Sequence, residues 1–570
     1  MRQGIHNEKF SVHVIAGTHV ITLAFDAKKE AATGLLGFAI HRTKCNKDGT
    51  PKGEGGWMLG YKPFEEVVPD PQPKIKYSTH EHPIQSFVWA DFGVEPGNVY
   101  RYKVQPVFGT PTTLTYGNEL EITATAEPLK HDKHEIHFNR GAAASQAYAE
   151  RFDNIKPDDK HLTKKQQDER YKWLSHGLYE AVLAFIRQAK DSSYALRAAI
   201  YELDYPGVVQ TFKEVLDKGA DVKIVYEARD GQTQTKQNQQ ALKDAGFKIN
   251  DKKITFARTK TEGIPHNKFI VLLKNNIPVM LWTGSTNLSE GGIFGHSNLG
   301  HCIKDAEVAQ KYLDYWTMLK ANPDKPTLAE KISNKWPNSK AADLPKDKMS
   351  VFFSPRKGTQ MLNTYADVFA AAEHFATITL PFNLDKSFED KLNEDAKAVR
   401  YIMLNSGKGN FSIAEKFNPD ADVIVAPGSK IDGIWGQWLN EIHSGFNGAN
   451  VLYIHTKFLL KDPLGPAPVV ITGSANFSVP STNKNDENMV IVPCSNEQGK
   501  TRVQDIYLGE FFRLFDHLYF RYLHSIDTST EEEQRKRRFL KPNSKDWVAA
   551  YFKPGTDRFK RRENFSFGFE

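Results

Sequence analysis

Two short stretches of the chain carry histidine, lysine, serine and asparagine at the same spacing. The first reads IPHNKFIVLLKNNIPVMLWTGSTNLS (residues 264–289), and the second reads YIHTKFLLKDPLGPAPVVITGSANFS (residues 453–478). The residues that repeat are His266, Lys268, Ser285 and Asn287 in the first copy, and His455, Lys457, Ser474 and Asn476 in the second. One offset of 189 residues relates both ends of the motif without a gap (455 − 266 and 476 − 287).

A single His-x-Lys pair would mean little, because alternation places both side chains on one face of any strand. Two copies with one internal spacing are harder to explain as the polar ends of β-hairpins, since hairpin turns do not require histidine and lysine. The repeat therefore favours one shared reactive site over two structural hairpins.

These side chains supply the groups that cleavage of a phosphodiester through a covalent intermediate needs. One neutral imidazole can attack phosphorus, while the other, protonated, gives a proton to the leaving oxygen and later takes one from water. The lysine ammonium groups, the asparagine amides and the hydroxyls of Ser285 and Ser474 can hold the non-bridging oxygens. We therefore expect no metal or other cofactor. A local set of possible metal ligands, His296, His301 and Cys302, lacks a second pair at zinc spacing and is a poor metal site.

The paired motif resembles that of the phospholipase D superfamily, in which His-x-Lys is followed by Gly-Ser-x-Asn and then by an acidic or amide residue. The resemblance covers roughly residues 130 to 525. It implies hydrolysis or transfer at a phosphodiester, without a metal, through phosphohistidine. One departure is that Asp462 stands where the superfamily usually has aspartate, whereas the first copy has Leu273 there. Some members do without this aspartate, so the departure weakens the choice of subfamily more than the catalytic assignment.

The resemblance also assigns different roles to the two histidines. The same offset places Asn298 opposite Glu487 (487 − 298 = 189), and in the superfamily this residue of one half orients the histidine of the other half. Glu487 is then expected to face His266, and Asn298 to face His455. A carboxylate on one ring nitrogen leaves the other nitrogen free to attack and stabilises the resulting cation. His266 is therefore the predicted nucleophile and His455 the predicted general acid and base.

The elements that must position these residues follow from the apolar pattern. Residues 9 to 126 alternate short apolar stretches with turns, which indicates an antiparallel β-sandwich. Within it, VEPGNVYRYKV (residues 94–104) resembles the tyrosine-containing corner of fibronectin type III domains. Helices and strands alternate from Trp173, and the same element order restarts at residue 350. The predicted fold class is α/β, with two fused phospholipase D-like halves built on mostly parallel sheets and preceded by an all-β sandwich.

The predicted organisation has five parts. They are a fibronectin type III-like sandwich (1–128), a first half (129–322), a Pro- and Lys-rich linker (323–349), a second half (350–525) and a basic tail that packs on the core (526–570). One chain carries both motifs, so the active site needs no partner chain.

The substrate is less well specified by the sequence than the chemistry. The net charge of +6, the pI near 8.7 and the basic tail favour a nuclease, because Lys and Arg can follow a sugar-phosphate backbone. A phospholipase D that hydrolyses or transfers phosphatidyl groups is the alternative, and it would need an exposed apolar rim. A non-catalytic binding or scaffold protein is the third candidate. Its best support is Leu273, but both copies keep histidine, lysine and asparagine.

Aromatic residues near the motifs, Phe294, Trp435 and Trp438, could stack a base, hold an acyl chain or pack in the core. No apolar run approaches the roughly 18 residues of a transmembrane helix. The first residues, MRQGIHNEKF, lack the features of a secretory signal, so a cytoplasmic location is expected.

Overall fold

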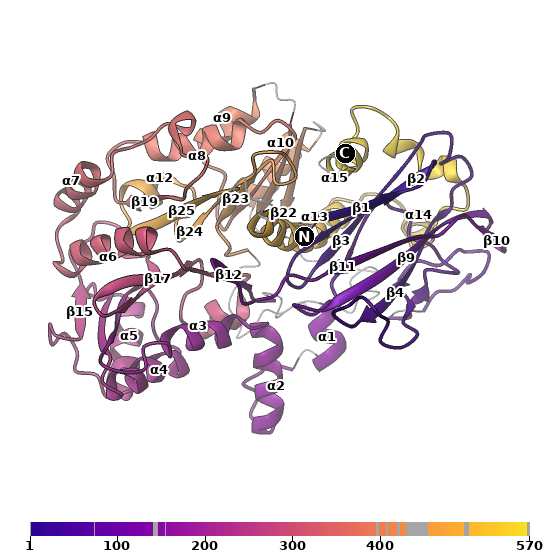
Figure 1. Cartoon of the computed structure of the whole chain (residues 1–570). Helices are drawn as coiled ribbons and strands as arrows, with labels where there is room; N and C mark the ends of the chain where they lie inside the picture. Colours follow the sequence, from indigo (N-terminus) through magenta and orange to yellow (C-terminus); the bar gives the residue numbers. More distant parts are fainter. Residues whose placement is uncertain are drawn as a thin grey trace.

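Figure 1 shows the computed structural model of the chain, in which N-terminal sheets lie beside two α/β halves. The structure describes residues 2–72, 74–140, 146–153, 155–394, 398–405, 408–418, 422–428, 454–494 and 501–566. Trp435 and Trp438 lie outside the described residues.

The N-terminal region consists of antiparallel sheets. One sheet has the order β1-β2-β3-β8, and the other has the order β10-β9-β4-β5 with β11 also paired to β9. These strands are β1 (Arg2–His6), β2 (Phe10–Ala16), β3 (Ile21–Ala27), β4 (Gly37–Cys45), β5 (Gly56–Trp57), β8 (Val88–Asp91), β9 (Val99–Thr110), β10 (Thr113–Tyr116) and β11 (Leu120–Thr125). A separate two-stranded sheet joins β6 (Leu59–Gly60) to β7 (Tyr77–Ser78).

Apolar side chains from both of the larger sheets, among them Val14, Leu23 and Tyr102, form one buried cluster between them. The hydroxyl of Tyr100 accepts a hydrogen bond from the backbone N–H of Glu95 at 2.9 Å, in the stretch that resembles a fibronectin type III corner. The fibronectin type III likeness stays a prediction.

Two seven-stranded sheets repeat one strand order. The first sheet is β12-β18-β17-β16-β13-β14-β15, and the second is β19-β25-β24-β23-β20-β21-β22. The strands of the first are β12 (His134–Phe138), β13 (Tyr194–Ile200), β14 (Asp221–Glu227), β15 (Thr255–Arg258), β16 (Lys268–Lys274), β17 (Ile277–Gly284) and β18 (Leu299–Ile303). The strands of the second are β19 (Ser350–Ser354), β20 (Phe375–Leu380), β21 (Val399–Leu404), β22 (Val423–Pro427), β23 (Phe458–Lys461), β24 (Val469–Gly473) and β25 (Glu487–Pro493).

The predicted α/β fold with two repeated halves is confirmed, but the expectation of mostly parallel sheets is wrong. In each sheet two pairings are parallel and four are antiparallel. The difference arises because each motif folds as a hairpin, β16–β17 or β23–β24, whose strands must run antiparallel. Only the strands joined by crossover helices are parallel.

Helices cover the outer faces of the two sheets and fill the space between them. On the outer faces lie α3 (Leu178–Ile186), α4 (Pro206–Asp217), α5 (Thr233–Asp244), α8 (Gln360–Ala370), α9 (Lys386–Leu392) and α10 (Lys408–Phe417). Between the sheets lie α6 (Ala306–Lys320) and α13 (Arg502–Ser525), whose buried side chains join one cluster with strands of both halves. Along α13, aromatic residues such as Phe511, Phe512 and Phe515 are buried on several sides, as expected of a helix enclosed by other elements.

The linker segment 323–349 also contains a helix. Within 323–349, α7 (Lys325–Lys335) begins after Asp324, whose side chain accepts a hydrogen bond from the backbone N–H of Thr327. Its Leu328 and Ile332 are buried in the cluster between the sheets, so this part of the polar segment packs rather than only running over the surface. The remaining short elements of the two halves are α1 (Gln146–Phe152), α2 (Lys164–Ser175), η1 (Gly291–Gly295), η2 (Ala341–Asp343) and α12 (Val479–Asn483).

The C-terminal segment contacts both the N-terminal sheets and the second half. It contains α14 (Glu531–Lys536), η4 (Ser544–Asp546), η5 (Ala549–Tyr551) and α15 (Asp557–Ser566). Trp547 donates its indole N–H to the carbonyl of Leu35 at 3.0 Å, and Phe565 joins the cluster between the two halves. Several of its basic side chains form ion pairs, including Arg561 with Asp516 at 2.6 Å and Arg562 with Asp26 at 2.7 Å.

Candidate active site

The two motifs meet where the halves touch. His266 lies two residues before Lys268, the first residue of β16. Lys268 pairs with Ile200 at the carboxyl end of β13. In the second half, His455 precedes β23, which pairs with β20 in the same way. Ser297 and Ile454 form a parallel bridge between the halves, and the backbone N–H of His455 donates to the carbonyl of Ser297 at 3.2 Å. The strand pairing therefore brings two distant segments to one edge.

His266 is held by a carboxylate from the other half. Its Nδ1 lies 2.9 Å from both carboxylate oxygens of Glu487, which is fully buried at the start of β25. Asn485 donates its amide to Oε1 of Glu487 at 3.1 Å. Because the carboxylate only accepts hydrogen bonds, the proton of a neutral His266 sits on Nδ1, and Nε2 keeps a free lone pair.

His455 is held by an amide from the other half. Its Nδ1 lies 2.8 Å from Oδ1 of Asn298. The amide group of Asn298 donates to the carbonyl of Gly292 at 2.7 Å, while Ser285 donates its hydroxyl to the same Oδ1 at 2.8 Å. These bonds fix the orientation of the Asn298 amide, so Nδ1 of His455 also carries a proton and its Nε2 is free.

The two lysines lie beside the histidines in matching positions. Lys268 donates to the carbonyl of His266, and Lys457 donates to the carbonyl of His455, each at 2.7 Å. Both side chains are buried, with 3% and 0% of their surface exposed. Each ammonium group carries three protons, so one such bond leaves donors for another acceptor.

Burial has a strong effect on the acidity of this cluster. Desolvation lowers the pKa of His266 to about 4, although the charge of Glu487 opposes the shift. Desolvation, aided by the charge of Lys457, holds the pKa of His455 well below 6.5. The pKa of Lys268 falls to about 8 and that of Lys457 falls well below its usual range, again through burial. Both histidines are therefore neutral at pH 7, and the cluster has too little negative charge for its buried cations.

The serines and asparagines of the motif differ in what they contact. The hydroxyl of Ser285 contacts Asn298, and that of Ser474 accepts a hydrogen bond from the backbone N–H of Asn488 at 3.0 Å. Both serines thus position the strand that carries the histidine partner. By contrast, the amide oxygens of Asn287 and Asn476 are buried without a hydrogen-bond partner. Buried polar atoms are rarely left unpaired, so the two amides are the members of the motif whose hydrogen bonding is incomplete.

The aspartate that only the second copy of the motif contains lies away from this cluster. Asp462 follows the far end of β23 and accepts hydrogen bonds from the backbone N–H groups of Glu373, His374 and Phe375. It therefore anchors the turn that leads into β20. In the first half Leu273 is buried in the apolar cluster between the sheets, so the loss of aspartate there changes packing and not the histidine cluster.

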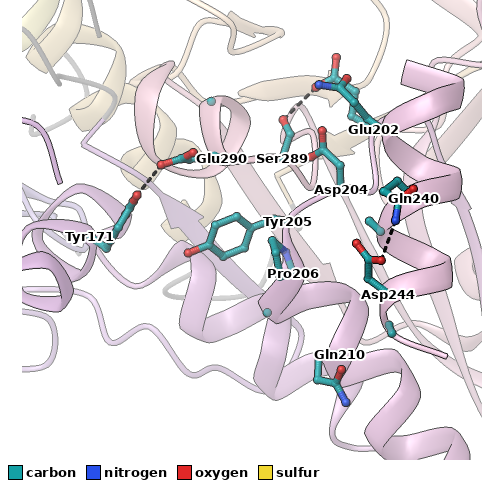
Figure 2. A pocket seen from close by; sticks show the side chains of 15 residues that line it. Tyr171, Glu202, Asp204, Tyr205, Pro206, Gln210, Gln240, Asp244, Ser289 and Glu290 are labelled. Atoms are coloured by element: carbon teal, nitrogen blue, oxygen red, sulfur yellow. Dashed lines mark hydrogen bonds between the residues drawn. The ribbon is translucent and has the colours of Figure 1, made fainter. Parts of the chain in front are cut away.

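A cavity of about 960 Å³ adjoins the first motif (Figure 2). Its wall includes four carboxylates, Glu202, Asp204, Asp244 and Glu290, and two tyrosines, Tyr171 and Tyr205, and contains no lysine or arginine among the described residues. Glu202 accepts a hydrogen bond at 2.8 Å from Ser289, two residues beyond Asn287. Burial and the nearby Glu202 raise the pKa of Asp204 to about 6. This side of the site favours cationic or neutral groups.

Some residues around the site had no signal in the sequence. Asn139 at the end of β12 donates its amide to the carbonyls of Ile293 and His296 and accepts from the backbone N–H of Asn298. Asn485 lies two residues before Glu487 in the sequence, and this nearness is the only sequence signal for its contact. Neither belongs to the repeat, because the offset of 189 residues places His296 opposite Asn485, and Pro355 follows β19 where Asn139 follows β12.

The remaining sequence predictions around the site have structural explanations. Within the possible metal set, His301 contacts His134 at 3.0 Å and the hydroxyl of Tyr507 at 3.1 Å. Across the described residues no group of three or more His, Cys, Asp or Glu side chains is arranged to hold a metal ion. Phe294 is 1% exposed and packs among Tyr171, Tyr179 and Tyr205. No helix in the described ranges is both long and apolar enough to cross a bilayer.

The first half matches a known family model. The model described as "Cardiolipin synthase, PLD-like domain" matches residues 182–319, which include His266, Lys268, Ser285, Asn287 and Asn298. This segment is phospholipase D-like. The second motif lies outside the matched residues. No curated protein matches the chain.

Solved structures with a similar chain path share little sequence with it. Phosphatidylserine synthase from Haemophilus influenzae is 14% identical over 68% of this chain and 92% of its own, with a TM-score of 0.42. The phospholipase D family member Nuc from Salmonella typhimurium is 22% identical over 25% of this chain and 87% of its own, with a TM-score of 0.21. Yeast tyrosyl-DNA phosphodiesterase is 12% identical over 55% of this chain and 85% of its own, with a TM-score of 0.29.

Proposed function

We propose that the chain is a metal-independent phosphodiesterase of the phospholipase D superfamily that acts through a phosphohistidine on His266. The observation that carries the proposal is the crossed pairing of the histidines. His266 is bound by a carboxylate and His455 by an amide, each from the opposite half, so His266 is the ring whose phosphorylated, cationic form a negative charge would stabilise.

In the first step, Nε2 of His266 attacks phosphorus, and the bond from phosphorus to the leaving oxygen breaks. The leaving oxygen takes the proton from Nε2 of protonated His455, and Glu487 balances the positive charge on phosphorylated His266. In the second step, water gives its proton to His455 while its oxygen attacks phosphorus and breaks the N–P bond. Lys268, Lys457 and the amides of Asn287 and Asn476 hold the non-bridging oxygens.

His455 can act as a general acid at pH 7 only if the bound substrate raises its pKa. In the free protein the pKa of His455 is well below 6.5, because burial and the nearby lysine disfavour a further positive charge. A bound phosphodiester brings a negative charge to this cluster and raises that pKa. Substrate binding at pH 7 is then coupled to the uptake of one proton.

Nucleic acid remains the first candidate substrate, on the basis of the chain's net charge of +6. The basic tail supports it less than its composition indicated, because several of its charges are paired with carboxylates. The nuclease assignment therefore depends on positively charged side chains elsewhere on the surface of the protein.

A phospholipid substrate is the second candidate, and two observations favour it. The cavity beside the first motif is acidic and would suit a positively charged headgroup better than a polyanion. On the second half, Phe382 lies two residues beyond β20 and is 54% exposed, as an apolar rim for a bilayer surface would be.

The test is to incubate the purified protein and EDTA with plasmid DNA, single-stranded nucleic acid and phosphatidylcholine vesicles in parallel. Cleavage of nucleic acid alone selects the nuclease, and release of choline selects the lipase. His266→Ala and His455→Ala should each abolish the activity found, whereas His161→Ala, an exposed histidine of the first half, should not. Activity that survives in both active-site variants would contradict the mechanism, and silence on all substrates favours a scaffold protein.

A further inference from the structure

A second large cavity lies on the N-terminal sheets. It has a volume of about 770 Å³, which lies in the range of small-ligand sites. Its wall combines aromatic rings with basic side chains: Trp57, Tyr61, Trp89, Phe92 and Tyr100 with Arg42, Lys44, Lys52 and Lys76. In composition it is the opposite of the acidic cavity beside the first motif.

The apolar part of this wall is unusually open to solvent. Phe92 is 50% exposed, and Leu59 on the same cavity is 54% exposed. Trp57 is held from behind by His41 and His80, with ring centroids 5.2 and 4.4 Å away. Phe92 thus offers open apolar surface, and the partly buried Trp57 offers a ring that loses little further side-chain entropy on binding.

Three of the four cations of the wall are ion-paired, Arg42 with Asp91, Lys44 with Glu95 and Lys76 with Glu150, so its excess positive charge lies on Lys52. Lys44 is paired with Glu95, but Lys52 makes no ion pair or side-chain hydrogen bond to any described residue. Arg42 contacts Asp91 through Nη1 alone, at 2.9 and 2.8 Å. Its position is therefore fixed while its remaining donors stay available for a phosphate.

The carboxylate of Asp91 holds both Arg42 and the loop that follows β8. It accepts hydrogen bonds from Nη1 of Arg42 and from the backbone N–H of Gly93, each at 2.9 Å. These two contacts fix the arginine–aspartate pair at the wall of the cavity.

The cavity is continuous with the catalytic part of the chain. Tyr61 and Lys76 on its wall contact Glu150 of α1 at 3.0 and 3.2 Å. Tyr148 and Phe152 of the same helix belong to the apolar cluster of the first half. Figure 1 shows α1 between the N-terminal sheets and the first half. A strand bound in the cavity would be tethered to the catalytic halves.

We propose that this cavity binds single-stranded nucleic acid, with bases stacked on Phe92 and Trp57 and phosphates contacted by Arg42 and Lys52. A wall that combines aromatic rings with cationic groups fits a polymer of bases and phosphates, whereas a neutral sugar would not use the unpaired cation. The proposal rests on the nuclease form of the proposed function and gives the N-terminal sheets the role of substrate capture.

The test measures the affinity of the full chain for a fluorescent 12-nucleotide single strand by anisotropy over a range of salt concentrations. All proteins carry His266→Ala so that the strand stays intact. Lys52→Glu and Phe92→Ala should each weaken binding about tenfold, the effect of one lost phosphate or base contact. Lys52→Glu should also lower the salt slope by about 0.7, whereas Phe92→Ala should leave it unchanged.

Lys29→Glu is the matched control, because it makes the same charge change at an exposed site outside the cavity. Equal affinities of the Lys52 and Lys29 variants would overturn the proposal, as would tighter binding of a neutral oligosaccharide or of anionic vesicles. Turnover of bis(p-nitrophenyl) phosphate, measured with His266 present, should be unchanged by Lys52→Glu. If the protein bound the strand in this cavity but cleaved no nucleic acid, the proposed nuclease activity would be wrong and the proposed binding site would stand.

Discussion

The charge of Glu487 gives the sharpest test of the mechanism, because Glu487→Gln removes the charge and keeps the shape. The carboxylate is fully buried and lies 2.9 Å from Nδ1 of His266. Two unit charges about 3 Å apart attract by about 5 kcal/mol at an effective dielectric constant near 20. The transition state carries only part of that charge, so we expect kcat/KM to fall by about 10³- to 10⁴-fold, the range in which a histidine–carboxylate pair acts in other hydrolases.

The assay is single-turnover cleavage of bis(p-nitrophenyl) phosphate by rapid mixing, with thermal unfolding of the same samples. Asp462→Asn is the matched control, since it neutralises another buried carboxylate of the second half, one that contacts backbone N–H groups and Lys461 but not the histidine cluster. It should lower the melting temperature and leave the rate within a few-fold. If Glu487→Gln kept its rate within tenfold of the wild type, the carboxylate would not stabilise the cation and His266 would lose its assigned role.

Three further outcomes follow from the same geometry. Because nitrophenol needs no proton to leave, His455→Ala should accumulate phosphohistidine on His266 with bis(p-nitrophenyl) phosphate, detectable by mass spectrometry; label on residue 455 in the wild type would reverse the roles. The pKa of His266 falls from 6.5 to about 4 on folding, so kcat/KM should stay high below pH 6.5 and fall only near pH 4. The stability of the fold depends on pH in the same direction. Because folding lowers the pKa of His266, the contribution of its neutral ring to the free energy of unfolding is complete above pH 6.5 and is lost as the pH falls toward 4. A series of melting curves at different pH values will measure this loss. Arg258 and Asp486 form a fully buried ion pair between the halves at 2.7 Å, and Asp486→Ala should cost about 3–5 kcal/mol in urea denaturation because it leaves the arginine unpaired; a loss below 1 kcal/mol would show that the pair is replaceable.

The sequence was sufficient for the repeat and for the number of halves, because both depend on spacing and periodicity. The antiparallel character of the sheets was missed, since apolar runs mark strands without giving their direction. A family resemblance predicted that Glu487 contacts His266 and that Asn298 contacts His455. No local sequence pattern encodes a contact such as that of His266 with Glu487, which are 221 residues apart.

Other features depended on three-dimensional neighbours that no pattern reveals. Ser285 and Ser474 looked like ligands for phosphate oxygens, but strand pairing places the hydroxyl of Ser285 against Asn298 and that of Ser474 against Asn488, which follows Glu487. The polar segment 323–349 looked like a surface linker, although Leu328 and Ile332 at helical spacing were available to predict a packed helix. The two large cavities could not be predicted, because the first is lined by residues from several separate helices and loops, and the second by residues from several separate strands and loops.

The crossed pairing of the histidines also bears on protein synthesis. Glu487 lies 221 residues after His266, so it leaves the ribosome roughly 10 to 40 seconds later at ordinary rates of elongation. During that interval the first half can fold, yet its histidine has no carboxylate and no second imidazole. Under the proposed mechanism, a nascent chain therefore cannot cleave a phosphodiester until the second half has been made and has docked.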